Sequence, residues 1–470
     1  MEDFSEYLDE NESNIIKKYE SLVLNNNDFY MDEDDYQIVI DHYLSYLDFS
    51  KANQAISIAE RTFPESIEIQ FRKGKKLFFE NSYDNALKIL RKIIALDPAN
   101  TEFLFFKARI YSSLNKHVKA IETYQLILSI NDDFEENFIY YLISEEFEKL
   151  NKFDLAFEYK KKAALANTED LFVLTELFVD TKEDSKNETL AFLNNLIEED
   201  PYNYNVWFTL GCFHTKFNDT NKAIDAYDYV IAINKKMISA YYNKANIYFN
   251  KGDFYEAIKI YDEILEHDDN QAHVFYMMAI TYDNLCDFAN AVKYYKKVLE
   301  IDEFYSEAWY NIALIFYEEE KLQKSLKYVD NAINIDDDDF RYYHLKGKIL
   351  FELDNYKEAE ENYIRCMVPE YDSSQLLVDY AELISYSESI EKSVEILRDA
   401  VENNPTNSQL NLYLSGYLFK LGKRKEAKTF FEDSVICDTA FLEDFFIDFP
   451  ELKEDKSIVK ILNKYKSNEL

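Results

Sequence analysis

Hydrophobic and small positions alternate with polar ones along this chain in a pattern that returns every 34 residues. An alanine, serine or threonine occupies the same place in twelve successive stretches, and only two intervals differ, one of 36 and one of 33 residues. A period of about 20 to 50 residues indicates a repeat architecture, in which each repeat packs only on its neighbours. The small residues are Ala52, Ala86, Ala120, Ala156, Thr189, Ala223, Ala257, Ala291, Ser325, Ala359, Ser393 and Ala427.

Other positions keep the same register when each repeat is taken to begin 19 residues before its small residue. Position 8 is then small in ten repeats, as at Gly211 and Gly347, and position 24 is apolar or aromatic in eleven, as at Tyr227 and Tyr363. Small residues at positions 8 and 20 allow two helices to approach closely. The larger residues at position 24 are expected to fill the seam between those helices.

Helix-breaking residues keep the register too. Gly252 and Gly422 both fall at position 15, where a turn between two helices needs freedom in its backbone angles. Each repeat is therefore predicted to be a helix, a short turn, a second helix and a connection. Four of the six prolines fall at position 32, in the predicted connection: Pro64, Pro98, Pro201 and Pro405.

The spacing of Trp207, Leu210, Gly211, Ala223 and Tyr227 resembles the tetratricopeptide repeat. The resemblance extends over residues 33 to 441, and it implies antiparallel helix pairs stacked into a right-handed superhelix with an inner groove. We therefore predict an all-α fold, a right-handed superhelical solenoid of about twelve helix-turn-helix repeats with terminal capping helices.

The pattern weakens between residues 131 and 190, where the two irregular intervals adjoin. Glu176, Asp180 and Thr189 stand at positions that are otherwise apolar or small, and the polar stretch 181–187 is long for a turn. A bend or softer junction is predicted there. A second weak point is predicted at Pro369, which falls two places early and would end its helix prematurely.

Five segments follow from this reading. We expect an acidic N-terminal capping segment (1–32), an N-terminal arm of four repeats (33–169), a degenerate repeat that acts as a junction (170–203), a regular arm of seven repeats (204–441) and a C-terminal capping helix (442–470). Both caps carry apolar stripes at helical spacing. The stripes are Ile15, Tyr19 and Leu22, and then Ile458, Ile461, Leu462 and Tyr465.

Motifs that carry chemistry are missing from the sequence. The six histidines form no i, i+4 pair, the four cysteines form no CxxC pair, and there is no phosphate-binding loop or nucleophile elbow. The acidic run 336–339 lacks the ligand spacing of a calcium loop and is expected in a connection. We expect no enzyme activity, no metal and no cofactor. Without a secretory signal or an 18-residue apolar stretch, a cytoplasmic protein is predicted.

Charge bears on the partners. Ninety acidic residues against 52 basic ones give a net charge of −38, which disfavours nucleic acid and anionic membranes. Two explanations remain open, because the charge either keeps a long apolar-rich solenoid soluble or steers a basic protein or peptide toward it. The salt dependence of binding would separate them.

In the family that the chain resembles, the first helix of each repeat lines the inner groove, and position 5 is one of its groove positions. Seven repeats carry an aromatic ring there, and rings offer large contact area with little side-chain entropy to lose. Alternatively, the rings pack against the next repeat. The candidate partner-binding residues are Phe71, Phe105, Tyr141, Phe208, Tyr242, Tyr276 and Tyr310, with Asn243, Asn246 and Asn311 as backbone-binding amides.

The sequence thus predicts a protein-interaction scaffold or adaptor that binds a peptide or helix of a partner in its groove. One alternative is a regulator that senses a ligand or peptide by changing its superhelical pitch, and another is a self-associating assembly subunit. The carboxylate clamp of chaperone-binding members is incomplete, because Phe208 and Cys212 stand where a lysine and an asparagine are needed. The identity of the partner and the oligomeric state are left open.

Overall fold

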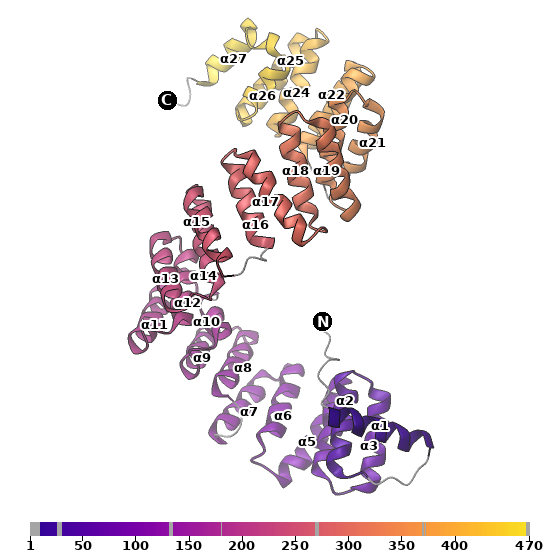
Figure 1. Cartoon of the computed structure of the whole chain (residues 1–470), viewed down its shortest axis with the longest axis vertical. Helices are drawn as coiled ribbons and strands as arrows, with labels where there is room; N and C mark the ends of the chain where they lie inside the picture. Colours follow the sequence, from indigo (N-terminus) through magenta and orange to yellow (C-terminus); the bar gives the residue numbers. More distant parts are fainter. Residues whose placement is uncertain are drawn as a thin grey trace. The chain divides into compact units, whose positions relative to one another are not determined.

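The computed structural model describes residues 10–25, 31–130, 135–179, 181–267, 272–368, 371 and 373–466. Every regular element in these ranges is a helix, and α2 to α25 form twelve successive pairs (Figure 1). The predicted all-α solenoid of twelve repeats is confirmed. The chain divides into two compact halves, Met1–Asn243 and Lys244–Leu470, with the division inside one helix, α14.

The first helix of each pair begins the repeat, and the second follows after a short turn. The first helices are α2 (Glu33–Ser45), α4 (Ile67–Phe79), α6 (Thr101–Ser113), α8 (Glu136–Lys149), α10 (Leu171–Val179), α12 (Tyr204–Lys216), α14 (Ile238–Asn250), α16 (Ala272–Asn284), α18 (Ser306–Glu318), α20 (Phe340–Glu352), α22 (Ser374–Ser387) and α24 (Ser408–Lys420). The second helices are α3 (Phe49–Thr62), α5 (Tyr83–Leu96), α7 (His117–Ile130), α9 (Phe153–Ala166), α11 (Lys186–Glu199), α13 (Thr220–Ile233), α15 (Phe254–Leu265), α17 (Phe288–Ile301), α19 (Leu322–Ile335), α21 (Tyr356–Cys366), α23 (Ile390–Asn403) and α25 (Arg424–Cys437).

The seam inside each pair forms where the small residues meet. All twelve residues at position 20 are buried, and none is more than 2% exposed. The hydroxyl of Ser325 donates to the carbonyl of Ala313 at 2.6 Å, which joins position 20 of α19 to position 8 of α18. At Gly347 an added Cβ would lie 2.6 Å from the ring of Tyr363. Positions 8, 20 and 24 therefore meet as the spacing predicts.

The turns inside the pairs share one backbone conformation. Position 15 has a positive φ in ten of the twelve pairs, and only two of these residues are glycine. The left-handed residue lets the next amides bond back to the helix end, as Ser82 N–H does to the carbonyl of Leu77 at 2.8 Å. The ten residues are Leu47, Asn81, Asn115, Asn151, Asn218, Gly252, Cys286, Glu320, Asp354 and Gly422.

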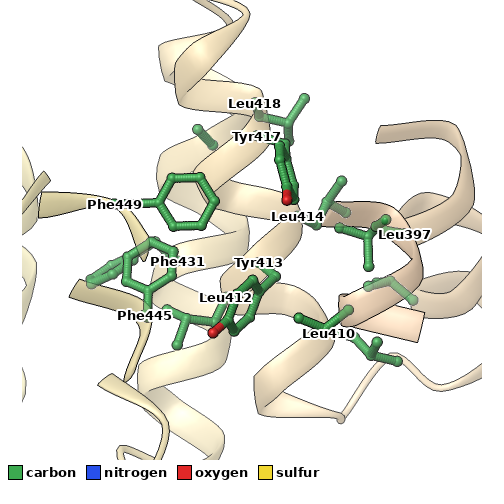
Figure 2. Packing of buried hydrophobic residues seen from close by; sticks show 14 of the residues in the cluster. Leu397, Leu410, Leu412, Tyr413, Leu414, Tyr417, Leu418, Phe431, Phe445 and Phe449 are labelled. Carbon is green, nitrogen blue, oxygen red and sulfur yellow. The ribbon is translucent and has the colours of Figure 1, made fainter. Parts of the chain in front are cut away.

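Both ends of the array are capped. Helix α1 (Glu10–Asn25) buries Tyr19 against the first pair. At the other end α26 (Leu442–Asp448), a 3-10 turn η3 (Pro450–Leu452) and α27 (Lys456–Lys466) follow the last pair, and Ile458 on α27 is fully buried. Figure 2 shows Phe445 and Phe449 packed beside Tyr413 and Tyr417 of α24. Predicted cap residues 1–9, 26–30 and 467–470 lie outside the described residues.

The α10/α11 pair departs from the others. Helix α10 has 9 residues where the other first helices have 13 or 14, and a 3-10 turn η2 (Glu183–Ser185) replaces the left-handed turn. The hydroxyls of Thr181 and Thr189 lie 2.9 Å apart in its buried seam. The Lys216 ammonium of α12 donates to the carbonyls of Phe178, Val179 and Thr181 at 2.6–3.1 Å.

The short helix and the 3-10 turn lie within the stretch where the sequence pattern weakens, and the chain divides into its two compact halves at residues 243/244. The second predicted weak point corresponds to α21, which ends at Cys366 after 11 residues, whereas most second helices have 14. Pro369 itself lies outside the described residues. Whether residues 170–203 act as a hinge stays a prediction.

Candidate protein-interaction surface

Phe71, the first candidate of the N-terminal half, lies in the core. Its ring is fully buried on α4 and packs on Phe103 and Phe106 of α6, with ring centroids 4.7 and 5.3 Å away. A buried ring offers no contact area to a partner, so Phe71 is removed from the candidate set. The packing of one repeat on the next, the alternative open at the sequence level, explains this residue.

Phe105 and Tyr141 are half-buried, and each meets a more exposed ring of the next first helix. Phe105 of α6 lies 6.0 Å from Phe138 of α8, and Tyr141 of α8 lies 5.2 Å from Phe172 of α10. Phe138 is 43% exposed and Phe172 is 57% exposed. These four residues are called the N-terminal ring surface. The sequence analysis missed Phe138 and Phe172 because it followed position 5 alone, whereas they stand at positions 2 and 3.

Charged groups lie near both ring pairs of this surface. The Arg109 guanidinium lies 5.9 Å from the ring of Phe105 and 5.1 Å from that of Phe78. Near Tyr141, burial raises the pKa of the Glu145 carboxyl. Burial, together with the charge of Glu145, also raises the pKa of Tyr141 to about 12. The Tyr141 hydroxyl therefore stays neutral at physiological pH and is able to donate a hydrogen bond.

The remaining candidates of the N-terminal half lie on α12 and α14. Phe208 is half-buried, with its ring 5.9 Å from that of Tyr227. The amide of Asn243 donates to the Tyr227 hydroxyl at 3.3 Å and approaches the Cys212 sulfur at 3.6 Å. Tyr242 is partly buried. An asparagine amide has two donors and an acceptor, so Asn243 keeps capacity for a backbone group.

The C-terminal half holds Asn246, Tyr276, Tyr310 and Asn311. The amide of Asn311 donates to the Tyr276 hydroxyl at 3.3 Å, which links α18 to α16. The rings of Tyr310 and Tyr342 of α20 are tilted with centroids 4.9 Å apart, and burial raises the pKa of Tyr310 to about 12. Asn246 is exposed and accepts a long hydrogen bond from the Tyr261 hydroxyl at 3.5 Å. These rings contact the next repeat and are only partly open.

The nine remaining candidates therefore form separate groups. Phe208, Tyr242 and Asn243 belong to one half, whereas Tyr276 and Tyr310 belong to the other. Within each half the first helices of successive repeats contact one another, as α2 with α4 and α20 with α22. We therefore treat the candidate site as two first-helix surfaces, one for each half.

Glu382 is a further polar feature of the C-terminal half that the sequence analysis missed. It stands on α22 at position 9, another groove position of the family. Burial raises the pKa of Glu382 to about 7, helped by the carboxylates of Asp448, Asp379 and Glu352 and opposed by Lys420. Only its place in the repeat could have identified it, since two of the three neighbouring carboxylates, Glu352 and Asp448, come from other stretches of the chain.

The described residues contain no group of three or more histidine, cysteine or acidic side chains that could hold a metal ion. The acidic run 336–339 lies in the connection between α19 and α20, as predicted. Asp339 caps α20, because its carboxylate accepts from the N–H of Arg341 at 2.9 Å. No described helix is both long enough and apolar enough to span a membrane.

Helix pairs of this length, stacked in series, define an α-solenoid repeat protein. Profiles of the tetratricopeptide repeat match residues 77–137, 236–303, 276–340 and 340–367. The chain is a tetratricopeptide repeat protein, and in general terms a protein-interaction scaffold. No curated protein matches the sequence.

Three of the solved structures that are similar to this chain are described by identity, coverage and TM-score. A chain of the APC/C hetero-tetramer Cut9–Hcn1 is 12% identical, with 86% of this chain and 92% of that chain covered and a TM-score of 0.38. Yeast Tom70 is 16% identical, with 92% and 100% covered and a TM-score of 0.38. YrrB, a TPR protein with an unusual peptide-binding site, is 18% identical, with 41% and 91% covered and a TM-score of 0.31.

Proposed function

We propose that the protein is a scaffold or adaptor that binds a peptide or helix of a partner protein through its first-helix surfaces. The N-terminal ring surface carries this proposal. Its two ring pairs bridge successive first helices and leave Phe138 and Phe172 about half exposed. Exposed aromatic rings held by neighbouring rings are pre-ordered, so binding a partner costs little side-chain entropy.

The other candidates extend the proposed site. Phe208, Tyr242 and Asn243 continue it in the N-terminal half, and Tyr276, Tyr310, Asn246 and Asn311 supply the corresponding surface in the C-terminal half. Each asparagine already contacts a tyrosine hydroxyl, which fixes the direction of its amide. A fixed amide beside a ring suits an extended peptide, because the ring contacts a side chain while the amide bonds the backbone.

Electrostatics favours a basic partner. The net charge of −38 attracts a cationic segment over the Debye length and repels acidic ones. Steering of this kind changes the association rate more than the dissociation rate. If charge serves solubility alone, the association rate of the partner should change little between low and physiological salt.

The test is affinity capture from a lysate of the source cells with the full chain and a double variant, Phe138→Ser with Phe172→Ser. Both rings are exposed enough for the variant to fold, which circular dichroism and melting would verify. A matched control is Tyr255→Ser with Phe304→Ser, since these rings are 71% and 70% exposed and Tyr255 lies on a second helix.

We expect a partner to be retained by the wild type and the control and lost from the ring variant, with an affinity at least about tenfold weaker. Quantification by interferometry with the identified partner would give that ratio. Retention of every partner by the ring variant would contradict binding at this surface. A second variant with Tyr276→Ser and Tyr310→Ser tests the surface of the C-terminal half in the same way.

A further inference from the structure

A pocket of about 610 Å³ opens beside the irregular repeat of the N-terminal half. Its walls come from the end of α8, the first turns of α9 and the connection that contains η2. Phe153 and Leu155 contribute apolar surface and are 53% and 44% exposed. The other groups that matter here are Glu148, Glu158, Lys182, Asp184 and Glu188, which line the same pocket.

At this pocket one ring contact found in other repeats is missing. In three other pairs the aromatic residue that opens the second helix packs on an aromatic residue near the end of the first helix. In the α8/α9 pair that place is taken by Glu148, so Phe153 has no ring partner among the described residues. The three complete pairs are Phe78 with Tyr83 (5.7 Å), Phe249 with Phe254 (5.5 Å) and Phe351 with Tyr356 (5.9 Å).

A cation already lies on the uncovered ring. The Lys182 ammonium, from the connection that replaces the regular turn, is 5.0 Å from the centroid of Phe153. This distance is typical of a cation–π contact. The chain's own lysine therefore shows that a positive group fits on the exposed face of this ring.

The rim of the pocket is acidic beyond what its own lysines neutralise. Lys161 contacts Glu158 and Glu188, both at 2.6 Å, and Lys160 contacts Glu148 at 2.7 Å. Among the described residues no ion pair involves Asp184, which also lines the pocket. A ligand cation would therefore meet an aromatic face and a carboxylate that has no lysine of its own.

We propose that this pocket binds an arginine side chain of a partner protein, with the guanidinium stacked on Phe153 in place of Lys182 and bonded to the rim carboxylates. Arginine fits better than lysine because its planar group stacks on a ring and can bond a carboxylate with two N–H groups at once. Leu155 and the other apolar residues of the wall contact the aliphatic stem. The site does not depend on the first-helix surfaces of the proposed function.

The test uses the full chain and two probes, acetyl-Leu-Arg-Leu-amide and the same tripeptide with citrulline in place of arginine. Citrulline keeps the shape of the side chain but lacks its charge. Ligand-observed NMR titration gives the dissociation constants. We expect the arginine peptide to bind at least about fivefold more tightly than the citrulline peptide, a ratio that should shrink at high salt.

Variants then locate the site. Phe153→Ala should weaken the arginine peptide about five- to tenfold, whereas Phe254→Ala, the matched ring of a complete pair, should leave it unchanged. Asp184→Asn should weaken it less, and Lys182→Gln should strengthen it by about twofold or more because the competing cation is removed. Equal binding of the two peptides, or wild-type affinity in both Phe153→Ala and Asp184→Asn, would overturn the proposal.

Discussion

The α20/α21 pair and the α10/α11 pair are both repeats of the array, but different contacts hold their helices together. In α20/α21, Tyr363 lies fully buried against the backbone at Gly347, so close that no Cβ fits between them. In α10/α11 the leucines Leu177 and Leu193 are buried, two threonine hydroxyls are in contact, and a lysine of the next repeat donates to the carbonyls at the end of α10.

The difference shows two ways of stabilising a repeat in a solenoid. A regular pair fills its own seam with a large buried ring, and the contacts with its neighbours add to that stability. In the irregular pair the first helix ends early, and polar groups bond the carbonyls at and after its end. One of these groups, the Lys216 ammonium, belongs to α12. Such a pair depends on its neighbour, and the connection that replaces its turn leaves room for a pocket beside it.

The largest expected effect comes from adding one methyl group to the regular seam. Gly347→Ala places Cβ 2.6 Å from the Tyr363 ring, so the ring or the helix must shift. We expect a loss of about 2 kcal/mol in the free energy of unfolding. Urea unfolding followed by circular dichroism would measure it, with local hydrogen exchange of α20 as a second readout.

Gly74→Ala is the matched control for this prediction. It stands at the same position 8, but its Cβ would lie 3.8 Å from Ile89 and Leu90, an ordinary contact. Because alanine favours a helix more than glycine does, this variant should be more stable by about 0.5 to 1 kcal/mol. If both variants lose stability to the same extent, the tight seam at Tyr363 is not the cause.

The two seams should also differ in their response to pH. Glu382, whose charge acts on Tyr363, has a pKa raised to about 7 by burial and by neighbouring carboxylates, above the value of about 4.3 expected in the unfolded chain. Between these values the folded state holds a proton that the unfolded state has lost. The contribution of Glu382 to stability is therefore present at low pH and falls as the pH rises toward 7.

The measurement is the melting temperature of the wild type and of Glu382→Gln from pH 5 to pH 8. We expect the wild type to lose stability relative to the variant across this range, by on the order of 1 kcal/mol. Hydrogen exchange should localise the loss to the C-terminal half. The neutral threonine contact of the α10/α11 seam should show no such dependence, and a parallel course of the two melting curves would refute the assignment to Glu382.

The repeat itself could be predicted from the sequence because its rules are local. Twelve helix pairs follow from the small residues at position 20, and the connections follow from prolines such as Pro98, two residues after the end of α5. The left-handed turns were visible only at Gly252 and Gly422, because asparagine, cysteine and glutamate occupy the same conformation elsewhere.

The candidate site was only partly predictable, because exposure depends on the neighbouring repeat. Phe71 and Phe105 stand at the same position 5, yet Phe71 is covered by two rings of α6 and Phe105 stays half-exposed beside Phe138. Periodicity predicts on which face of its helix a residue lies, but it does not predict which side chains of the next helix cover that face. The pocket at Phe153 likewise combines residues of separate helices, such as Glu148 and Glu188, which periodicity alone does not bring together.

The smallest expected effect tests whether the irregular pair depends on its neighbour. Lys216→Met removes the ammonium that donates to three carbonyls at the end of α10 and keeps the aliphatic stem. Since the lysine is exposed, the loss should be about 0.5 to 1 kcal/mol. The readout is hydrogen exchange of α10, which should already be less protected than α18 in the wild type and should lose further protection in the variant.

Lys251→Met is the control, because the wild-type Lys251 ammonium lies 3.9 Å from Asp253. Uniform protection across residues 170–203 and the regular pairs would show that this repeat is no softer than the others, and the predicted junction would then be wrong.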